Sequence, residues 1–238
     1  MPTYLYCLIA ADAAVDPGAT LGIDGAPVRV IGDGLVRAIV SDVGERTVAP
    51  NAGRARAHDE IVRLAMRGAT PLPARFGQTF PTDRAALESI AEREADLSRA
   101  LASVAGCVEM TLRLPLRVSA PSESNEPRVD GGAGRRYLLA LQARERLEHD
   151  MQLEAQLARD RVGRQVAGLI REERWEVTAI GTSTLVLSHL LLRSAVSDYR
   201  AAVTSPGFLE SVAGMMVSGP WAPYSFVTPI EGGTGVDH

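Results

Sequence analysis

The stretch Cys107-Val108-Glu109-Met110-Thr111-Leu112-Arg113-Leu114-Pro115-Leu116-Arg117-Val118 carries a strict two-residue alternation. Every even-numbered position is Val, Met or Leu, while most odd-numbered positions are polar or charged. Successive side chains of a strand point to opposite faces of its sheet, so this pattern predicts a half-buried β-strand. Proline cannot donate a ladder hydrogen bond, so Pro115 indicates that the far end lies at a sheet edge or a bulge.

The chain after this strand follows the order of a ferredoxin-like domain. The pattern predicts a long amphipathic helix over 134–171, strands over 175–180 and 182–192, a helix over 194–204 and a last strand over 209–218. Together with the strand at 107–118 this is β-α-β-β-α-β, the split βαβ arrangement. At 1.5 Å per residue the long helix would reach roughly 55 Å. We therefore expect it to overhang the sheet or to break at Gly163 or Gly168.

The chain before this strand has a different pattern. The apolar run 3–10 predicts a buried strand, and strands over 28–31 and 35–40 are joined by the hairpin signal Gly32-Asp33-Gly34. Asn51 can cap a helix over 53–67, and Thr82 can cap another that ends at Gly106. We expect an α+β protein of two domains: a small N-terminal α+β domain over 1–80, and a C-terminal ferredoxin-like domain over 81–238 that includes the preceding helix, the long helix and an aromatic tail.

Composition excludes several kinds of function. The net charge of −4 argues against a general nucleic-acid surface, and all 25 basic residues are arginine, which excludes Schiff-base and P-loop lysines. No apolar run approaches the ~20 residues of a membrane span, and Met1-Pro2-Thr3 does not resemble a signal peptide. Cys7 and Cys107 fall in apolar runs and are interpreted as reduced, buried residues of a cytoplasmic protein, although a disulfide between them stays open.

No catalytic or metal-binding constellation is apparent. The four histidines lack metal-ligand spacing, and His58 and His189 are interpreted as core or boundary residues. We therefore expect no metal, no cofactor and no enzymatic activity. Arg75 and Glu109 interrupt apolar segments, which suggests the hypothesis that they form an ion pair across the domain junction.

The segment Gly219-Pro220-Trp221-Ala222-Pro223-Tyr224-Ser225-Phe226-Val227 holds three of the eleven aromatic residues. Its two prolines favour a rigid turn that presents Trp221, Tyr224 and Phe226. Such a turn either clasps the chain end onto its own core or offers an anchor to a partner. The clasp is the more ordinary interpretation, and binding of a partner by the three aromatic residues is the functional one.

Five motifs, in order along the chain, resemble the gas vesicle protein GvpL/GvpF family. Leu72–Phe80, which includes Arg75, Phe76 and Gly77, is similar to its LP-x-RFG-x-x-F element, and Gly219–Val227 to its ending, with Ala222 where proline is usual. The opening strand Tyr4–Ile9, Gly106–Glu109 and Gly134–Leu138 resemble its other elements. On this basis Arg75, Phe76, Gly77, Glu109, Gly219 and Pro220 are structural motif residues.

The resemblance implies a two-domain α+β fold with a ferredoxin-like second domain. It also implies a gas vesicle assembly or minor structural protein, located at the gas vesicle in the cytoplasm, that binds the main shell subunit and other minor vesicle proteins. Such a protein would help nucleation by preventing aggregation of the apolar shell subunit, which exposes sticky surface before it assembles.

Two binding surfaces and two other functions stay open at this point. The surface could be a strand edge near Pro115 or at the Asp33 hairpin, or the long helix with the aromatic segment. The alternative function is a ferredoxin-like small-ligand-binding or cofactor-dependent enzyme domain with a pocket at His58 and Arg75. A dimeric scaffold without a vesicle role is the remaining option.

Overall fold

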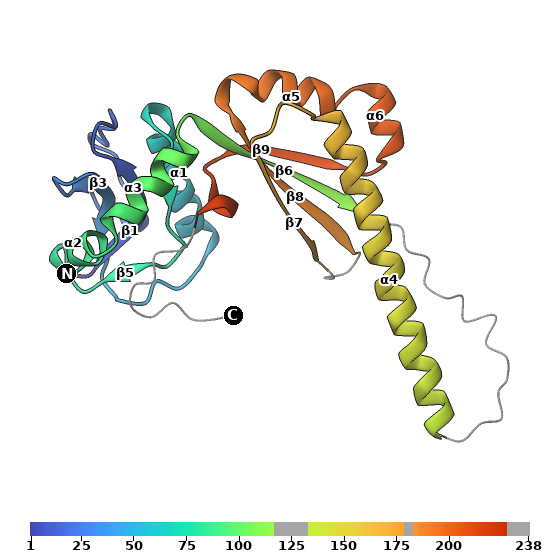
Figure 1. Cartoon of the computed structure of the whole chain (residues 1–238). Coiled ribbons are helices and arrows are strands. Elements are labelled where there is room, and N and C mark those ends of the chain that lie inside the picture. Colours follow the sequence, from blue (N-terminus) through green and yellow to red (C-terminus); the bar gives the residue numbers. More distant parts are fainter. Residues whose placement is uncertain (117–132, 179–182, 228–238) are drawn as a thin grey trace. The chain divides into compact units, whose positions relative to one another are not determined.

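The computed structural model of the chain describes residues 1–116, 133–178 and 183–227 (Figure 1). It divides into two compact units. The first holds residues 1–110, 190–193 and 219–227, and the second holds the described parts of 111–189 and 194–218. The predicted domain boundary at residue 80 stays a prediction.

The first sheet is built around β1 (Thr3–Ala10). The strand order is β2-β3-β1-β4, with β2 (Val28–Ile31), β3 (Val36–Asp42) and β4 (Leu72–Pro73), and β5 (Thr79–Phe80) also pairs with β1. All these pairs are antiparallel. Strand β1 is buried nearly from end to end and pairs with strands on both of its edges, which confirms the predicted first strand. The antiparallel pairing of β2 with β3 confirms the predicted hairpin.

The helices of the first unit begin where the capping residues predict. Asn51 caps α1 (Ala52–Gly68) by accepting the Arg54 N–H, and Thr82 caps α2 (Asp83–Ala91) by accepting the Ala85 N–H. Instead of one helix to residue 105, a second helix, α3 (Glu94–Val104), follows α2. The break falls at Glu92 and Arg93. The carboxylate of Glu94, the first residue of α3, accepts the Leu35 N–H at 2.7 Å.

The second sheet has the strand order β7-β8-β6-β9, which is the ferredoxin-like order. Its strands are β6 (Cys107–Pro115), β7 (Glu172–Thr178), β8 (Thr184–Leu192) and β9 (Met216–Trp221). The helices α4 (Ala133–Gln165) and α5 (Val196–Val203) complete the expected β-α-β-β-α-β order, and the short helices η3 (Arg193–Ala195) and α6 (Pro206–Ser211) are additions.

Three details of the second sheet and its helices differ from the sequence-based prediction. Strand β6 lies between β8 and β9, so Pro115 ends an interior strand and marks no sheet edge. Residues 107–112 are buried on both faces, so the strand is not half-buried. Residues 209–211 belong to α6, because Pro206 suits the first turn of a helix, and the last strand starts only after Gly214, at φ 84°.

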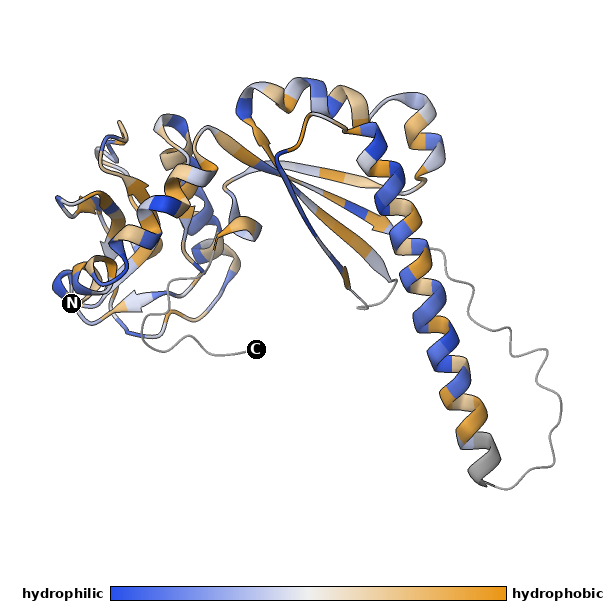
Figure 2. Ribbon diagram, viewed as in Figure 1, coloured by the Kyte–Doolittle hydropathy of each residue, from blue (hydrophilic) through white to orange (hydrophobic). Residues whose placement is uncertain are grey.

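Helix α4 is one continuous helix through Gly163, and it ends before Gly168. Its C-terminal half packs within the second unit through Ala155, Ala158 and Val162, which are at most 8% exposed. Residues 137–150 are exposed apart from the half-buried Leu147, so the predicted overhang is confirmed. Figure 2 shows apolar residues continuing along this overhanging half.

Candidate functional site

The segment 219–227 is held against the first unit by a buried carboxylate. The Glu109 side chain is 4% exposed; its Oε2 accepts the Ser225 N–H at 2.8 Å, and its Oε1 accepts the Ser225 hydroxyl at 2.7 Å. Hydrogen bonds to a carboxylate are strong, and they offset the cost of burying its charge. Glu109 thus fixes the turn that contains η4 (Tyr224–Phe226).

The expected ion pair between Arg75 and Glu109 is wrong. Arg75 is exposed, and no ion pair joins it to Glu109 in the part of the chain that the structure describes. The hydrogen bonds from Ser225 fill the role assigned to the arginine, because a neutral backbone N–H and a hydroxyl satisfy both oxygens of the carboxylate.

Gly219 allows β9 to approach the backbone of β6 closely at Glu109 and Met110. Its φ of 111° lies in a region that favours glycine. A Cβ atom at this position would lie 2.7 Å from the carbonyl oxygen of Glu109 and 2.9 Å from the Met110 sulfur. The motif that ends in Glu109 and the motif that begins with Gly219 are therefore one local structure.

The structure buries one of the three aromatic residues of this segment and leaves the other two partly exposed. Phe226 is 9% exposed and belongs to the core cluster of the first unit, so it acts as the clasp. Tyr224 is 39% exposed, and Trp221 is partly exposed with the Arg63 guanidinium 4.7 Å from its ring centroid. Arg63 in turn forms an ion pair with Asp59 at 2.6 Å.

We call Trp221, Tyr224 and Arg63 the aromatic patch. Burial raises the pKa of Tyr224, the Asp59 charge raises it further, and the Arg63 charge opposes this increase. Trp, Tyr and Arg are the residues most enriched at interface hot spots, and all three meet in this patch.

The Arg75-Phe76-Gly77 motif closes over a buried group of aromatic residues. The Gly77 N–H donates to the Tyr4 hydroxyl at 3.1 Å, and that hydroxyl lies 2.9 Å from His58 Nδ1. The Phe76 ring centroid is 5.9 Å from that of His58. The Tyr4 hydroxyl thus hydrogen-bonds with both the Gly77 backbone and the His58 ring, and these contacts hold the motif against the buried group.

Sequence reasoning placed His58 and His189 in the core, and the structure confirms this at 4% and 0% exposure. It missed their partners. Tyr199 and Glu173 lie 2.7 Å and 3.0 Å from the two ring nitrogens of His189. A tyrosine on a buried strand needs a hydrogen-bond partner for its hydroxyl. Tyr4 and Tyr6 on the first predicted strand therefore indicated that buried polar partners lie near this strand. The Tyr6 hydroxyl lies 2.8 Å from the Ser41 hydroxyl.

Acidification should destabilise the protein through His58. Burial lowers the pKa of His58 from 6.5 to about 4, against smaller opposing effects of Asp59 and the Ala74 carbonyl. The unfolded state therefore takes up this proton first, and stability present above pH 6.5 is lost as the pH falls to about 4. We expect a loss of about 3 kcal/mol from this group, measured by urea unfolding across that range.

The variant His58→Gln should flatten this pH dependence, because the glutamine amide can still hydrogen-bond with the Tyr4 hydroxyl but does not titrate. His149→Gln, on the exposed half of α4, is the matched control. An unchanged slope in His58→Gln would show that other groups, such as His189, whose pKa is also lowered by burial, cause the loss.

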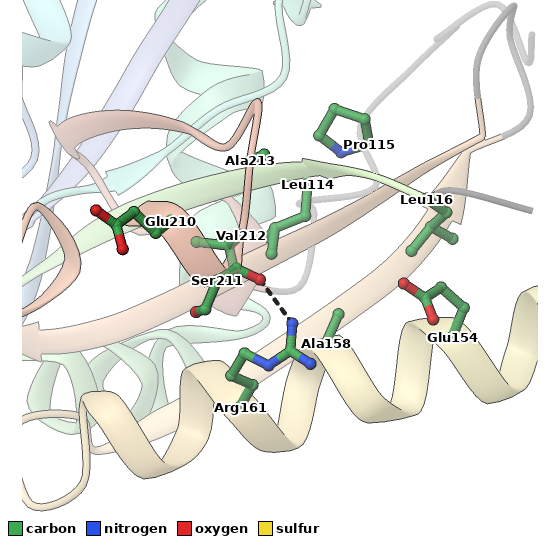
Figure 3. Close-up of a pocket in the computed structure, with 10 residues that line it drawn as sticks. All are labelled: Leu114, Pro115, Leu116, Glu154, Ala158, Arg161, Glu210, Ser211, Val212 and Ala213. Atoms are coloured by element: carbon green, nitrogen blue, oxygen red, sulfur yellow. Dashed lines mark hydrogen bonds between the residues drawn. The ribbon is translucent and has the colours of Figure 1, made fainter. Parts of the chain in front are cut away.

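A cavity of about 220 Å³ lies in the second unit, between the end of β6, helix α4 and the residues after α6 (Figure 3). Its charged residues are Glu154, Glu210 and Arg161, and Arg161 donates to the Ser211 carbonyl at 2.7 Å. Neither His58 nor Arg75 lines it. The pocket that the alternative function requires at those two residues is therefore not supported by this cavity.

The described residues offer neither a metal-binding cluster nor a membrane-spanning helix. The described residues contain no group of three or more His, Cys, Asp or Glu side chains that could hold a metal ion. No helix among them is long and apolar enough to cross a membrane.

Comparisons with known proteins agree on one family. A family model described as "Gas vesicle synthesis protein GvpL/GvpF" matches residues 2–228. The chain is 26% identical to gas vesicle protein L of Streptomyces sp. (strain CB03234) over 246 aligned positions, covering 94% of this chain and 91% of the relative. It is 34% identical to gas vesicle protein F of the same strain over 96 residues, which is 40% of each protein.

Two crystal structures share the fold. GvpF from Microcystis aeruginosa aligns with a TM-score of 0.76 at 16% identity, covering 94% of this chain and 98% of that one. GvpF from Anabaena sp. PCC7120 aligns with a TM-score of 0.74 at 14% identity, covering 100% and 99%. At such identities the likeness supports the α+β fold alone.

Proposed function

Because the chain belongs to the GvpL/GvpF family of gas vesicle synthesis proteins, we propose that it is a gas vesicle assembly or minor structural protein without enzymatic activity. It binds the main shell subunit, and in doing so it prevents aggregation and helps nucleation. It acts at the gas vesicle, in the cytoplasm, together with other minor vesicle proteins. The observation that carries this proposal is the family match across residues 2–228.

The aromatic patch is the surface that we assign to the shell subunit. The shell subunit of a gas vesicle is expected to be strongly apolar, and an apolar partner favours rigid aromatic side chains with little entropy to lose. Trp221 and Tyr224 are exposed in part, while Glu109 and Phe226 hold their backbone in place. A preorganised surface of this kind loses less entropy on binding than a mobile one.

The double variant Trp221→Ala with Tyr224→Ala should weaken capture of the main shell subunit at least about tenfold, because both anchors are lost. Phe226 is left unchanged, since it is buried and its removal would disturb the fold. The measurement is a pull-down with titrated shell subunit, together with light scattering of the shell subunit during dilution from denaturant.

Trp175→Ala is the matched control, because Trp175 is 45% exposed and has the Arg159 guanidinium 5.4 Å from its ring centroid. It should leave capture unchanged. Full capture by the folded double variant would reject the aromatic patch but keep the function. Absence of capture and of any effect on aggregation by the unaltered protein would reject the function itself.

A further inference from the structure

Strand β7 lies at one edge of the second sheet. In the strand order β7-β8-β6-β9 its single neighbour among the described strands is β8 (Figure 1). The backbone N–H and C=O groups along the outer side of an edge strand can pair with a strand of another chain. An edge strand therefore needs either a partner or features that prevent pairing.

A side chain of this strand holds the edge in place. Glu173 is largely buried, with 14% of its side chain exposed. Its Oε1 accepts a hydrogen bond from Arg159 Nε of α4, and its Oε2 lies 3.0 Å from His189 Nε2 of β8. These contacts tie β7 to a helix and to the neighbouring strand, so the edge loses little conformational entropy when it binds a partner.

Charges of alternating sign occupy the face of β7 opposite to Glu173. Side chains alternate along a strand, so Glu172, Arg174 and Glu176 share this face, and all three are exposed. Trp175 lies on the other face and is 45% exposed. Arg174 Nε lies 3.3 Å from Glu172 Oε1, with both side chains more than half exposed. A surface pair of this kind contributes little, so Arg174 can exchange Glu172 for another carboxylate at small cost.

The order of these charges is self-complementary in one antiparallel register. A second β7 that pairs with Trp175 opposite the partner's Trp175 sets Arg174 opposite the partner's Glu176, and Glu176 opposite the partner's Arg174. Opposite charges at directly opposed positions stabilise a sheet, and like charges destabilise it. A register centred on Arg174 or on Glu176 opposes like charges at its centre, and a parallel pair in register does so at every charged position. A register centred on Glu173 leaves most of β7 unpaired.

We propose that two copies of this chain associate by antiparallel pairing of β7 with β7, with the two-fold axis at Trp175. The two four-stranded sheets then form one continuous sheet. Charged residues on an edge strand commonly prevent pairing. Here they oppose the other registers and favour this one, so a second β7 is the partner that the edge fits. The seven residues of β7 give a small interface, and the dimer is therefore weak and reversible.

A cysteine at the two-fold axis tests the register directly. Directly opposed residues of antiparallel strands have Cα atoms about 4.5–5.5 Å apart, which is within the range of a disulfide. Trp175→Cys keeps the charged pairs and should cross-link to its own copy under mild oxidation. Glu172→Cys is the matched control, because it is exposed on the same strand but lies far from its own copy in this register. Cys7 and Cys107 are free and buried, so they do not compete.

Charge reversal tests the same register without a cross-link. Arg174→Glu alone and Glu176→Arg alone each replace two attractive contacts of the dimer by repulsive ones, and each should weaken association about tenfold. In an equimolar mixture of the two variants, both carboxylates of one chain face both guanidinium groups of the other. The mixture should therefore associate nearly as tightly as the unaltered protein. Arg84→Glu, which breaks an exposed pair with Glu88 on α2, is the matched control and should leave association unchanged.

Sedimentation velocity of the full chain up to about 200 µM measures association, with the fold checked by circular dichroism. A dimer that both reversals weaken, that mixing restores and that Trp175→Cys traps would support the proposal. A monomer throughout this range, a dimer insensitive to the reversals, a mixture no tighter than the separate variants, or equal cross-linking at residues 172 and 175 would overturn it. None of these results depends on binding to the shell subunit, so they stand apart from the proposed function.

Discussion

Replacing Gly219 with alanine is expected to lower the free energy of unfolding by about 4 kcal/mol. The φ of 111° strains any residue with a Cβ, and that Cβ would lie 2.7 Å from the Glu109 carbonyl oxygen. Backbone cannot move aside as the end of a side chain can, so β9 must shift away from β6. The shift would also weaken the two hydrogen bonds that Ser225 donates to the Glu109 carboxylate. Urea unfolding of the two proteins measures the effect.

Gly163→Ala is the control for this substitution. Gly163 lies within α4, and a Cβ there would meet no atom within 4 Å. Because alanine is the better helix former, this variant should gain about 0.5–1 kcal/mol. Equal stability of Gly219→Ala and the unaltered protein would show that the approach of β9 to β6 is not as tight as the structure has it.

The parts of the fold that sequence predicts are those set by neighbouring residues. The Asn51 and Thr82 caps act within three residues of themselves, and the apolar run of β1 marks a strand with neighbours on both sides. The β-α-β-β-α-β order follows from the period of each segment. The position of the last strand failed because Leu209 and Val212 suit a strand or a short helix equally well, and Pro206 decided for the helix.

The contacts that build the site could not be predicted from the sequence, because they join residues far apart in the chain. Glu109 and Ser225 are 116 positions apart, and nothing local distinguishes a carboxylate that binds an arginine from one that binds a backbone N–H. The same holds for the aromatic segment. Its composition predicts a rigid turn, but which ring enters the core depends on how the turn sits on β1, α3 and β6. The structure assigns Phe226 to the core, and leaves Trp221 and Tyr224 partly exposed.

Phe226→Ala should likewise cost about 4 kcal/mol, because it removes a buried ring from the core cluster of the first unit. Phe226→Leu keeps most of the apolar volume and should cost about 1.5 kcal/mol. Leu209→Ala, at a residue 40% exposed, is the surface control and should change stability by less than about 1 kcal/mol. The three variants are compared by urea unfolding followed by circular dichroism.

Loss of the Phe226 ring should also free the aromatic patch before the whole chain unfolds. The ring and the Glu109 carboxylate hold the same turn, so removal of the ring weakens the attachment of the turn to the first unit. We therefore expect Trp221 fluorescence, recorded with Trp175 replaced by phenylalanine, to change at lower urea than the circular dichroism signal does. If the two signals change together in Phe226→Ala, the segment unfolds with the core, and the clasp is an integral part of the first unit instead of a separable latch.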